Sequence, residues 1–129
     1  MNHRSTLVAA GLFGASGVGL GAVAAHRLET FLAERGMTHA WETAARYHLF
    51  HALALLAVAT WLQTATGARA GRARWAARCW SAGILLFSGS LYLFAVGGPH
   101  ALVYVTPFGG IALIAGWLCL VGAALAKDP

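Results

Sequence analysis

The chain has 129 residues and a net charge of +5; 59% of its residues are hydrophobic and only 10% are charged. Soluble domains average about 45 to 50% apolar and about 25% charged residues, and a small soluble fold with so few charges would expose large apolar patches to water. This composition excludes a soluble monomer and a disordered chain. We expect a single integral membrane domain over residues 1–129, with the lipid bilayer as its surroundings.

Membrane spans are expected where charges are absent, because a charge at the centre of a bilayer costs about 2.5 to 3.5 kcal/mol. Two charge-free runs, 5–25 and 47–68, each have the length of one helix across the bilayer. The third, 79–126, is too long for one helix and contains the turn sequence Gly-Gly-Pro-His at 97–100. The sequence therefore predicts an all-α, four-transmembrane-helix bundle with spans at about 5–25, 47–65, 79–96 and 107–126.

The first span resembles a secretory signal peptide, since Arg4 precedes it and Ala22-Val23-Ala24 imitates a cleavage site. Its charge-free run is longer than a typical signal core of about 7 to 15 residues. We therefore expect this helix to remain in the mature protein.

The stretch of about 20 residues between the first two spans is amphipathic. It predicts a short helix, a break at Gly36 and Thr38 as the N-cap of the next helix. Glu42 and Arg46 are four residues apart, with the acid first, so they are expected to pair on that helix.

The start of the last helix has two interpretations. Thr106 followed by Pro107 matches an N-cap with proline at the first helical position, which predicts a helix over 107–126. Alternatively, the helix begins near Ala101 and is kinked at Pro107. Both interpretations give four spans.

Small residues allow helices to approach one another closely in lipid. Such residues recur in three of the predicted helices, at Gly14, Gly17, Gly21, Gly89, Gly109, Gly110 and Gly116. We expect them to pack helices within one chain, with a dimer interface as the alternative.

A cluster of arginines lies between the second and third spans: Arg69, Arg72, Arg74 and Arg78. It resembles a basic loop that faces anionic lipid, so no nucleic-acid partner is expected. With a cytoplasmic N-terminus, this loop shares its side of the membrane with Arg4 and Lys127, while arginines and glutamates balance on the other side. The positive-inside rule therefore predicts both termini in the cytoplasm of a bacterial cell, in a multi-pass inner-membrane protein.

Histidine is the one ionisable residue type near the predicted bilayer core, and His26, His48 and His51 are the candidate functional residues. Their first interpretation is hydrogen bonding between helices and anchoring at the interface. The alternative is a haem, metal or proton site in the outer leaflet built on His26 and His51. Cys79 and Cys119 lie in apolar sequence without a metal-binding spacing and are expected to be buried structural residues.

None of the four spans contains Asp, Glu, Lys or Arg, which argues against a coupled exporter. No catalytic triad or carboxylate pair can be assembled, so we expect no enzymatic activity. A dimeric channel for small neutral solutes is a further hypothesis, based on Ser88, Ser90 and Tyr92.

Four blocks of sequence resemble the YgdD-like family of small membrane proteins, a family of unknown function: residues 19–26, 41–56, 82–92 and 106–117. The polar positions that match the family motif include Glu42, Arg46, Ser88, Ser90, Tyr92 and Thr106. In the first block, Val23 and Ala24 replace the Phe-Gly that is usual in the family. The resemblance implies a helical inner-membrane protein and leaves its activity open. The leading hypothesis is an accessory, assembly or structural subunit that packs against itself or a larger membrane complex.

Overall fold

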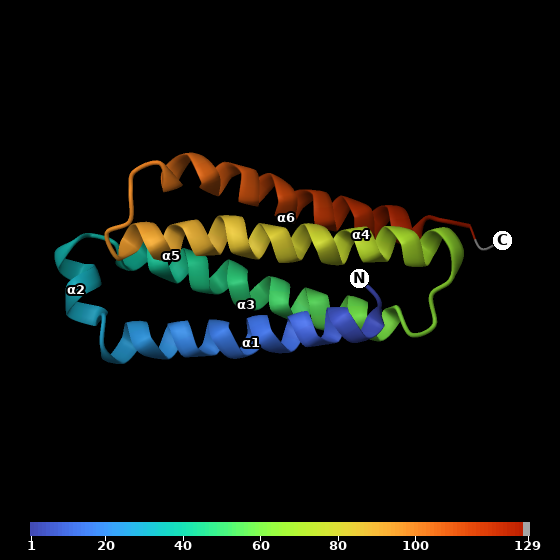
Figure 1. Cartoon of the computed structure of the whole chain (residues 1–129), viewed down its shortest axis with the longest axis horizontal. Helices are drawn as coiled ribbons and strands as arrows, with labels where there is room; N and C mark the ends of the chain where they lie inside the picture. Colours follow the sequence, from blue (N-terminus) through green and yellow to red (C-terminus); the bar gives the residue numbers. More distant parts are fainter. Residues whose placement is uncertain (128–129) are drawn as a thin grey trace.

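The computed structural model describes residues 1–127, which contain helices and connecting turns and no β-strand (Figure 1). The bounds are α1 His3–His26, α2 Glu29–Glu34, α3 Thr38–Trp61, α4 Gly67–Gly83, the π-helix η1 Ile84–Ser88, α5 Gly89–Ala95 and α6 Leu102–Ala124. Because α4, η1 and α5 follow one another without a break, they form one long helical segment. The prediction of an all-α fold with four long helices is confirmed.

The long helices pack in the order in which they occur along the chain. α1 lies against α3, α3 against the α4–η1–α5 segment, and that segment against α6, while the short α2 closes one end (Figure 1). Short connections place successive helices antiparallel and adjacent. The outer helices, α1 and α6, lie on opposite sides in this view (Figure 1), so each long helix packs mainly on its neighbours along the chain.

α1 begins at His3, two residues before the predicted span, and is the most exposed long helix. The Asn2 side chain accepts from the Ser5 backbone N–H at 2.9 Å, and Ser5 Oγ accepts from the Asn2 backbone N–H at 2.9 Å, which is a capping box. Only three of its residues are buried: Thr6, Ala10 and Gly17. Within residues 1–127, α1 and α6 are the two helices that are long and apolar enough, each by itself, to cross a membrane.

The loop predicted around the four arginines is wrong, because these residues belong to α4, which starts at Gly67. Alanine and arginine both favour helix, and alanines recur here at helical spacing. One face of α4 is thereby buried through Ala70, Ala73, Ala76, Ala77 and Trp80. A charge-free run estimates where a helix enters the bilayer, whereas this helix begins three turns earlier.

The first interpretation of the last helix is also wrong. α6 starts at Leu102, so Pro107 lies inside the helix and Thr106 is not its N-cap. The alternative start near Ala101 is correct. The Thr106 hydroxyl donates to the Leu102 carbonyl at 3.2 Å and lies 2.7 Å from Ser90 Oγ of α5. The turn that separates α5 from α6 falls at 97–100 as predicted, with Gly97 at φ +101°.

The predicted break before α3 is confirmed by Gly36, which has φ +66°. Thr38 is the first residue of α3, and Met37 occupies the N-cap position instead. The predicted Glu42–Arg46 ion pair does not occur in the described part of the chain. Glu42 lines a groove with residues of α1 and α2, and Arg46 lines a groove between α3 and α6.

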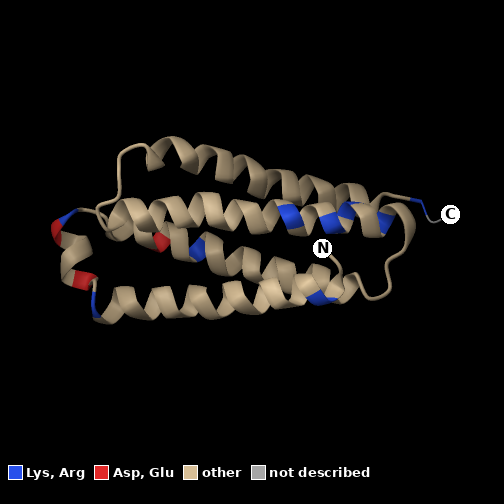
Figure 2. Ribbon diagram, in the orientation of Figure 1, with Lys and Arg blue, Asp and Glu red and all other residues tan. Residues whose placement is uncertain are grey.

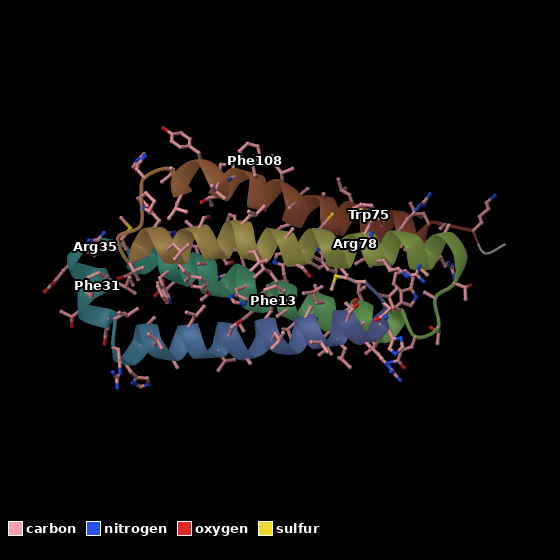
Figure 3. All side chains as sticks on the ribbon, in the orientation of Figure 1. Phe13, Phe31, Arg35, Trp75, Arg78 and Phe108 are labelled. Carbon is pink, nitrogen blue, oxygen red and sulfur yellow. The ribbon has the colours of Figure 1, made fainter. Side chains whose placement is uncertain are left out.

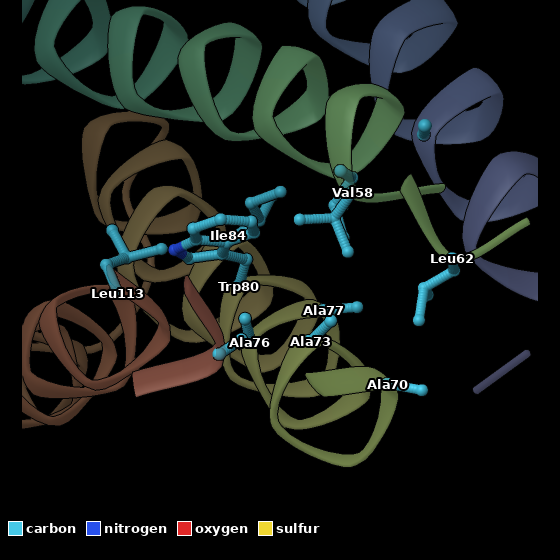
Figure 4. Packing of buried hydrophobic residues seen from close by; sticks show 12 residues of the cluster. Val58, Leu62, Ala70, Ala73, Ala76, Ala77, Trp80, Ile84 and Leu113 are labelled. Carbon is cyan, nitrogen blue, oxygen red and sulfur yellow. The ribbon is translucent and has the colours of Figure 1, made fainter. Parts of the chain in front are cut away.

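The core lies where α3, α4 and α6 meet (Figure 4). Trp80 is completely buried there, surrounded by Leu55, Val58, Ile84 and Leu113. Alanines on α4 keep the neighbouring helices close, as expected for packing in lipid.

Four of the seven predicted packing glycines contact another helix. A Cβ at Gly109 would overlap the Phe87 backbone nitrogen of η1, and one at Gly116 would overlap the Trp80 ring. A Cβ at Gly17 would lie 2.6 Å from Leu49 Cδ2, and one at Gly110 would make an ordinary 3.7 Å contact with the Phe87 ring. The other three, Gly14, Gly21 and Gly89, have no residue of another helix within 4 Å.

Candidate functional site

His48 and His51 are buried on α3, each with 4% of its surface exposed. They lie one turn apart and contact different neighbours. His48 faces α1 and α5, whereas His51 faces α6. Through these two residues, α3 is connected to every other long helix.

The His48 imidazole lies between two hydroxyl groups. Its Nε2 lies 3.3 Å from Ser16 Oγ on α1, and its Nδ1 lies 3.4 Å from the Tyr92 hydroxyl on α5. Ser16 donates its own proton to the Leu12 carbonyl at 2.8 Å, so it accepts from His48 Nε2–H. Nδ1 is then free to accept from Tyr92. Both ring nitrogens of His48 thus serve contacts between helices.

The His51 imidazole is held in the other tautomer. Its Nδ1 lies 2.7 Å from the Tyr47 backbone carbonyl, which can only accept, so Nδ1 carries the proton. Its Nε2 accepts from the Trp117 indole N–H of α6 at 3.1 Å. This neutral imidazole lies among aromatic rings: those of Tyr47, Phe50, Trp80 and Trp117.

The channel hypothesis was based on the hydroxyl groups of Ser88, Ser90 and Tyr92. All three form hydrogen bonds inside the protein. Ser88 donates to the Ala44 carbonyl of α3 at 2.8 Å, Ser90 pairs with Thr106, and Tyr92 pairs with His48. Ser88, Ser90 and Tyr92 are all buried. These side chains join η1 and α5 to their neighbours.

His26 is exposed at the last residue of α1, whereas His51 is buried within α3. The two residues that were considered for a haem or metal site are therefore not brought together. Among residues 1–127, no group of three or more His, Cys, Asp and Glu side chains is arranged to hold a metal ion. Cys79 and Cys119, which were expected to be buried, are only half-buried, and they are neighbours on α4 and α6.

Basic residues gather at the end of the molecule that carries both termini (Figure 2). Two of them bind the end of α6: Arg72 donates to the Gly122 carbonyl at 2.6 Å, and Arg69 donates to the Ala126 carbonyl at 3.1 Å. Arginines near a helix C-terminus satisfy carbonyls that lack helical partners and complement the helix dipole. The sequence prediction assigned these arginines to lipid and missed their role as caps.

The remaining arginines of α4 are exposed. Arg78 stacks on the Trp75 ring at 5.0 Å (Figure 3). Burial, together with the positive charges of Arg78 and Arg74, lowers the pKa of the Met1 amine, so the N-terminus lies beside α4.

Arg35, the C-cap residue of α2, plays the corresponding role at the opposite end. Its Nε donates to the Ala95 carbonyl at the last residue of α5, at 3.3 Å, and its guanidinium stacks on the Phe31 ring at 5.3 Å (Figure 3). Glu42, also near this end, lines a groove between α1, α2 and α3.

Arg46 lines a second groove, of about 380 Å³, between α3 and α6. The other lining residues are Tyr47, Phe50, His51 and Trp117. Sequence reasoning recognised Arg46 and His51 but missed the three aromatic residues, because the α3–α6 proximity appears only in the folded chain.

Comparison with known proteins assigns the chain to a family. Residues 20–110 match the family described as "Protein of unknown function (DUF423)". The chain is 41% identical to the UPF0382 membrane protein YwdK of Bacillus subtilis, over 84% of this chain and 85% of that protein. It is 40% identical to a UPF0382 membrane protein of Haemophilus influenzae, over 92% of this chain and 90% of the relative.

A third relative, the UPF0382 inner membrane protein YgdD of Escherichia coli, is 36% identical over 98% of this chain and 95% of that protein. No solved structure matches the chain. The expected family and the inner-membrane location are confirmed. With its multiple apolar helices, the chain is an inner membrane protein that belongs to the UPF0382 (DUF423) family, whose function is unknown.

Proposed function

We propose that this protein is a non-catalytic accessory subunit that binds a transmembrane helix of a partner along the outer face of α1. The partner is a subunit of a larger membrane complex or a second copy of the chain. The observation that carries the proposal is a groove of about 580 Å³ between α1 and α3. It is lined by small and aliphatic residues: Leu7, Ala10, Gly11, Gly14, Val18, Leu49, Ala52, Leu53 and Leu56.

Gly11 and Gly14 leave this groove open, since no residue of another helix lies within 4 Å of the place where either Cβ would be. These two glycines therefore do not serve close packing between helices of their own chain. In lipid, small residues on an exposed helix face favour close approach by a second helix. The exposure of most of α1 supports the same function.

The open space provides a test in which the fold is preserved. Gly14→Leu should fill the groove and abolish partner binding, whereas Gly19→Leu, on the same helix but outside the groove, should not. The complex is purified from native membranes in mild detergent, and its size is measured on a native gel. We expect the wild type and Gly19→Leu to run as a complex and Gly14→Leu to run as the monomer.

A photo-crosslinker placed at Gly11 should form a discrete adduct with the partner in intact cells, and the same group at Gly19 should not. A wild-type chain that runs alone, without a co-purifying protein, would contradict the accessory role. An unchanged complex in Gly14→Leu would contradict the proposed face.

We also propose that the end carrying both termini is cytoplasmic. Arg69, Arg72, Arg74 and Arg78 all lie on α4 at this end, together with Arg4 on α1 (Figure 2). Basic residues that flank spans are retained on the cytoplasmic side. α2, at the opposite end, then lies outside the cytoplasm.

This orientation predicts which positions a membrane-impermeant maleimide reaches in spheroplasts. Both native cysteines are first replaced by serine. Ala33→Cys, exposed on α2, should be labelled in intact spheroplasts, and Gly71→Cys, on α4, should be labelled only after permeabilisation. The reverse pattern would show the opposite orientation.

A further inference from the structure

The groove between α3 and α6 combines one cation with an aromatic wall. Arg46 is its only charged lining residue, and no carboxylate lines it. Phe50 and Trp117 are 64% and 40% exposed, although both are large and aromatic. The His51–Trp117 hydrogen bond joins the two helices at this groove.

Arg46 has no hydrogen-bond or ion-pair partner among residues 1–127, in contrast to Arg35, Arg69 and Arg72, which cap helices. Glu42, one turn earlier on α3, lines a different groove together with residues of α1 and α2 and forms no ion pair with Arg46. Arg46 is exposed, so its guanidinium is open to a ligand from outside the chain. A guanidinium can donate two parallel hydrogen bonds to two oxygens of one phosphate group.

The position of Arg46 along α3 agrees with a lipid ligand. It is the ninth residue of the helix, about 12 Å from the helix start at 1.5 Å per residue. It directly precedes the charge-free run 47–68, so it lies where headgroups meet hydrocarbon. Phe50 and His51 lie about one turn further toward the middle of the span.

We infer that this groove is a binding site for one anionic phospholipid. The phosphate pairs with Arg46 at the mouth, and an acyl chain lies along the rings of Phe50 and Trp117. Charge complementarity selects this occupant: one unopposed cation lies at the headgroup level, and the deeper lining is apolar and aromatic. This site lies between α3 and α6, apart from the proposed partner groove on α1 and α3, and does not rest on it.

The test measures retained lipid by native mass spectrometry of the purified full chain. Phosphatidylglycerol and diacylglycerol with identical acyl chains are compared, because only phosphatidylglycerol carries the phosphate. The wild type should retain one phosphatidylglycerol with about tenfold preference, the size of one charge-assisted hydrogen-bonded pair. Arg46→Gln, a change at an exposed side chain, should lose that preference and keep the wild-type melting temperature.

Arg27→Gln is the matched control, since Arg27 is exposed at the same end, does not line this groove and carries the same charge. It should retain the preference. Phe50→Ala should weaken retention of both lipids and leave their ratio unchanged. The inference is overturned if Arg46→Gln keeps the preference, or if Arg27→Gln loses it equally. Binding of glycerol phosphate as tight as that of the lipid would also overturn it, because the acyl contacts would then contribute nothing.

Discussion

Gly109→Ala is expected to destabilise the protein strongly, whereas Gly110→Ala next to it should not. A Cβ at Gly109 would overlap the Phe87 backbone nitrogen and lie 2.7 Å from the Leu86 carbonyl carbon. These are backbone atoms of η1, so they cannot turn away as a flexible side chain would. Overpacking of this kind costs about 1 to 3 kcal/mol, and more where the backbone must shift.

Gly110 is a close control because it lies in the same helix turn and a Cβ there would meet only the Phe87 ring, at 3.7 Å. Both substitutions gain about 1 kcal/mol in helix propensity, so the difference between them isolates the contact. The free energy of unfolding in mixed detergent micelles measures it. Equal stabilities for the two variants would show that α6 does not approach η1 this closely.

Gly116→Ala is expected to destabilise the protein as well, and Trp80→Phe should restore stability when the two are combined. A Cβ at Gly116 would meet the Cδ1, Nε1 and Cε2 atoms of Trp80, the pyrrole edge that phenylalanine lacks. Trp80 is completely buried and cannot move aside. Its indole N–H has no hydrogen-bond partner, so Trp80→Phe removes no hydrogen bond.

A double-mutant cycle measures this coupling. The single variants Gly116→Ala and Trp80→Phe should each unfold more easily than the wild type, the first by overpacking and the second by leaving a cavity. The double variant should be more stable than the sum of the two predicts, by about 1 to 3 kcal/mol. Purely additive effects would contradict the contact between α4 and α6.

Charge-free runs and turn residues predict the helices of this chain because both act locally. Charges avoid the bilayer core wherever they occur, and Gly36 and Gly97 adopt positive φ, which other residues rarely do. The start of α6 could not be predicted in the same way. Thr106 has the side chain of an N-cap, but in the folded chain its hydroxyl pairs with Ser90 of another helix.

The candidate site was predicted in part. The spacing of His48 and His51 places them on one side of a helix, and their burial agrees with hydrogen bonding between helices. Their partners are not encoded locally: Ser16 and Trp117 lie 32 and 66 residues away. For the same reason, glycine spacing identifies small residues but not their neighbours, so Gly14 and Gly17 looked equivalent although only Gly17 packs against α3.

The order in which the helices pack has a consequence for how the chain is made. Each long helix packs mainly on the one that precedes it, so almost every contact forms between segments that leave the ribosome in succession. α1 and α3 can complete one hairpin before α6 exists, and the α4–η1–α5 segment and α6 then complete the second. We expect biogenesis by pairwise addition, in which Ser88 and Tyr92 join the later hairpin to the earlier one through α3.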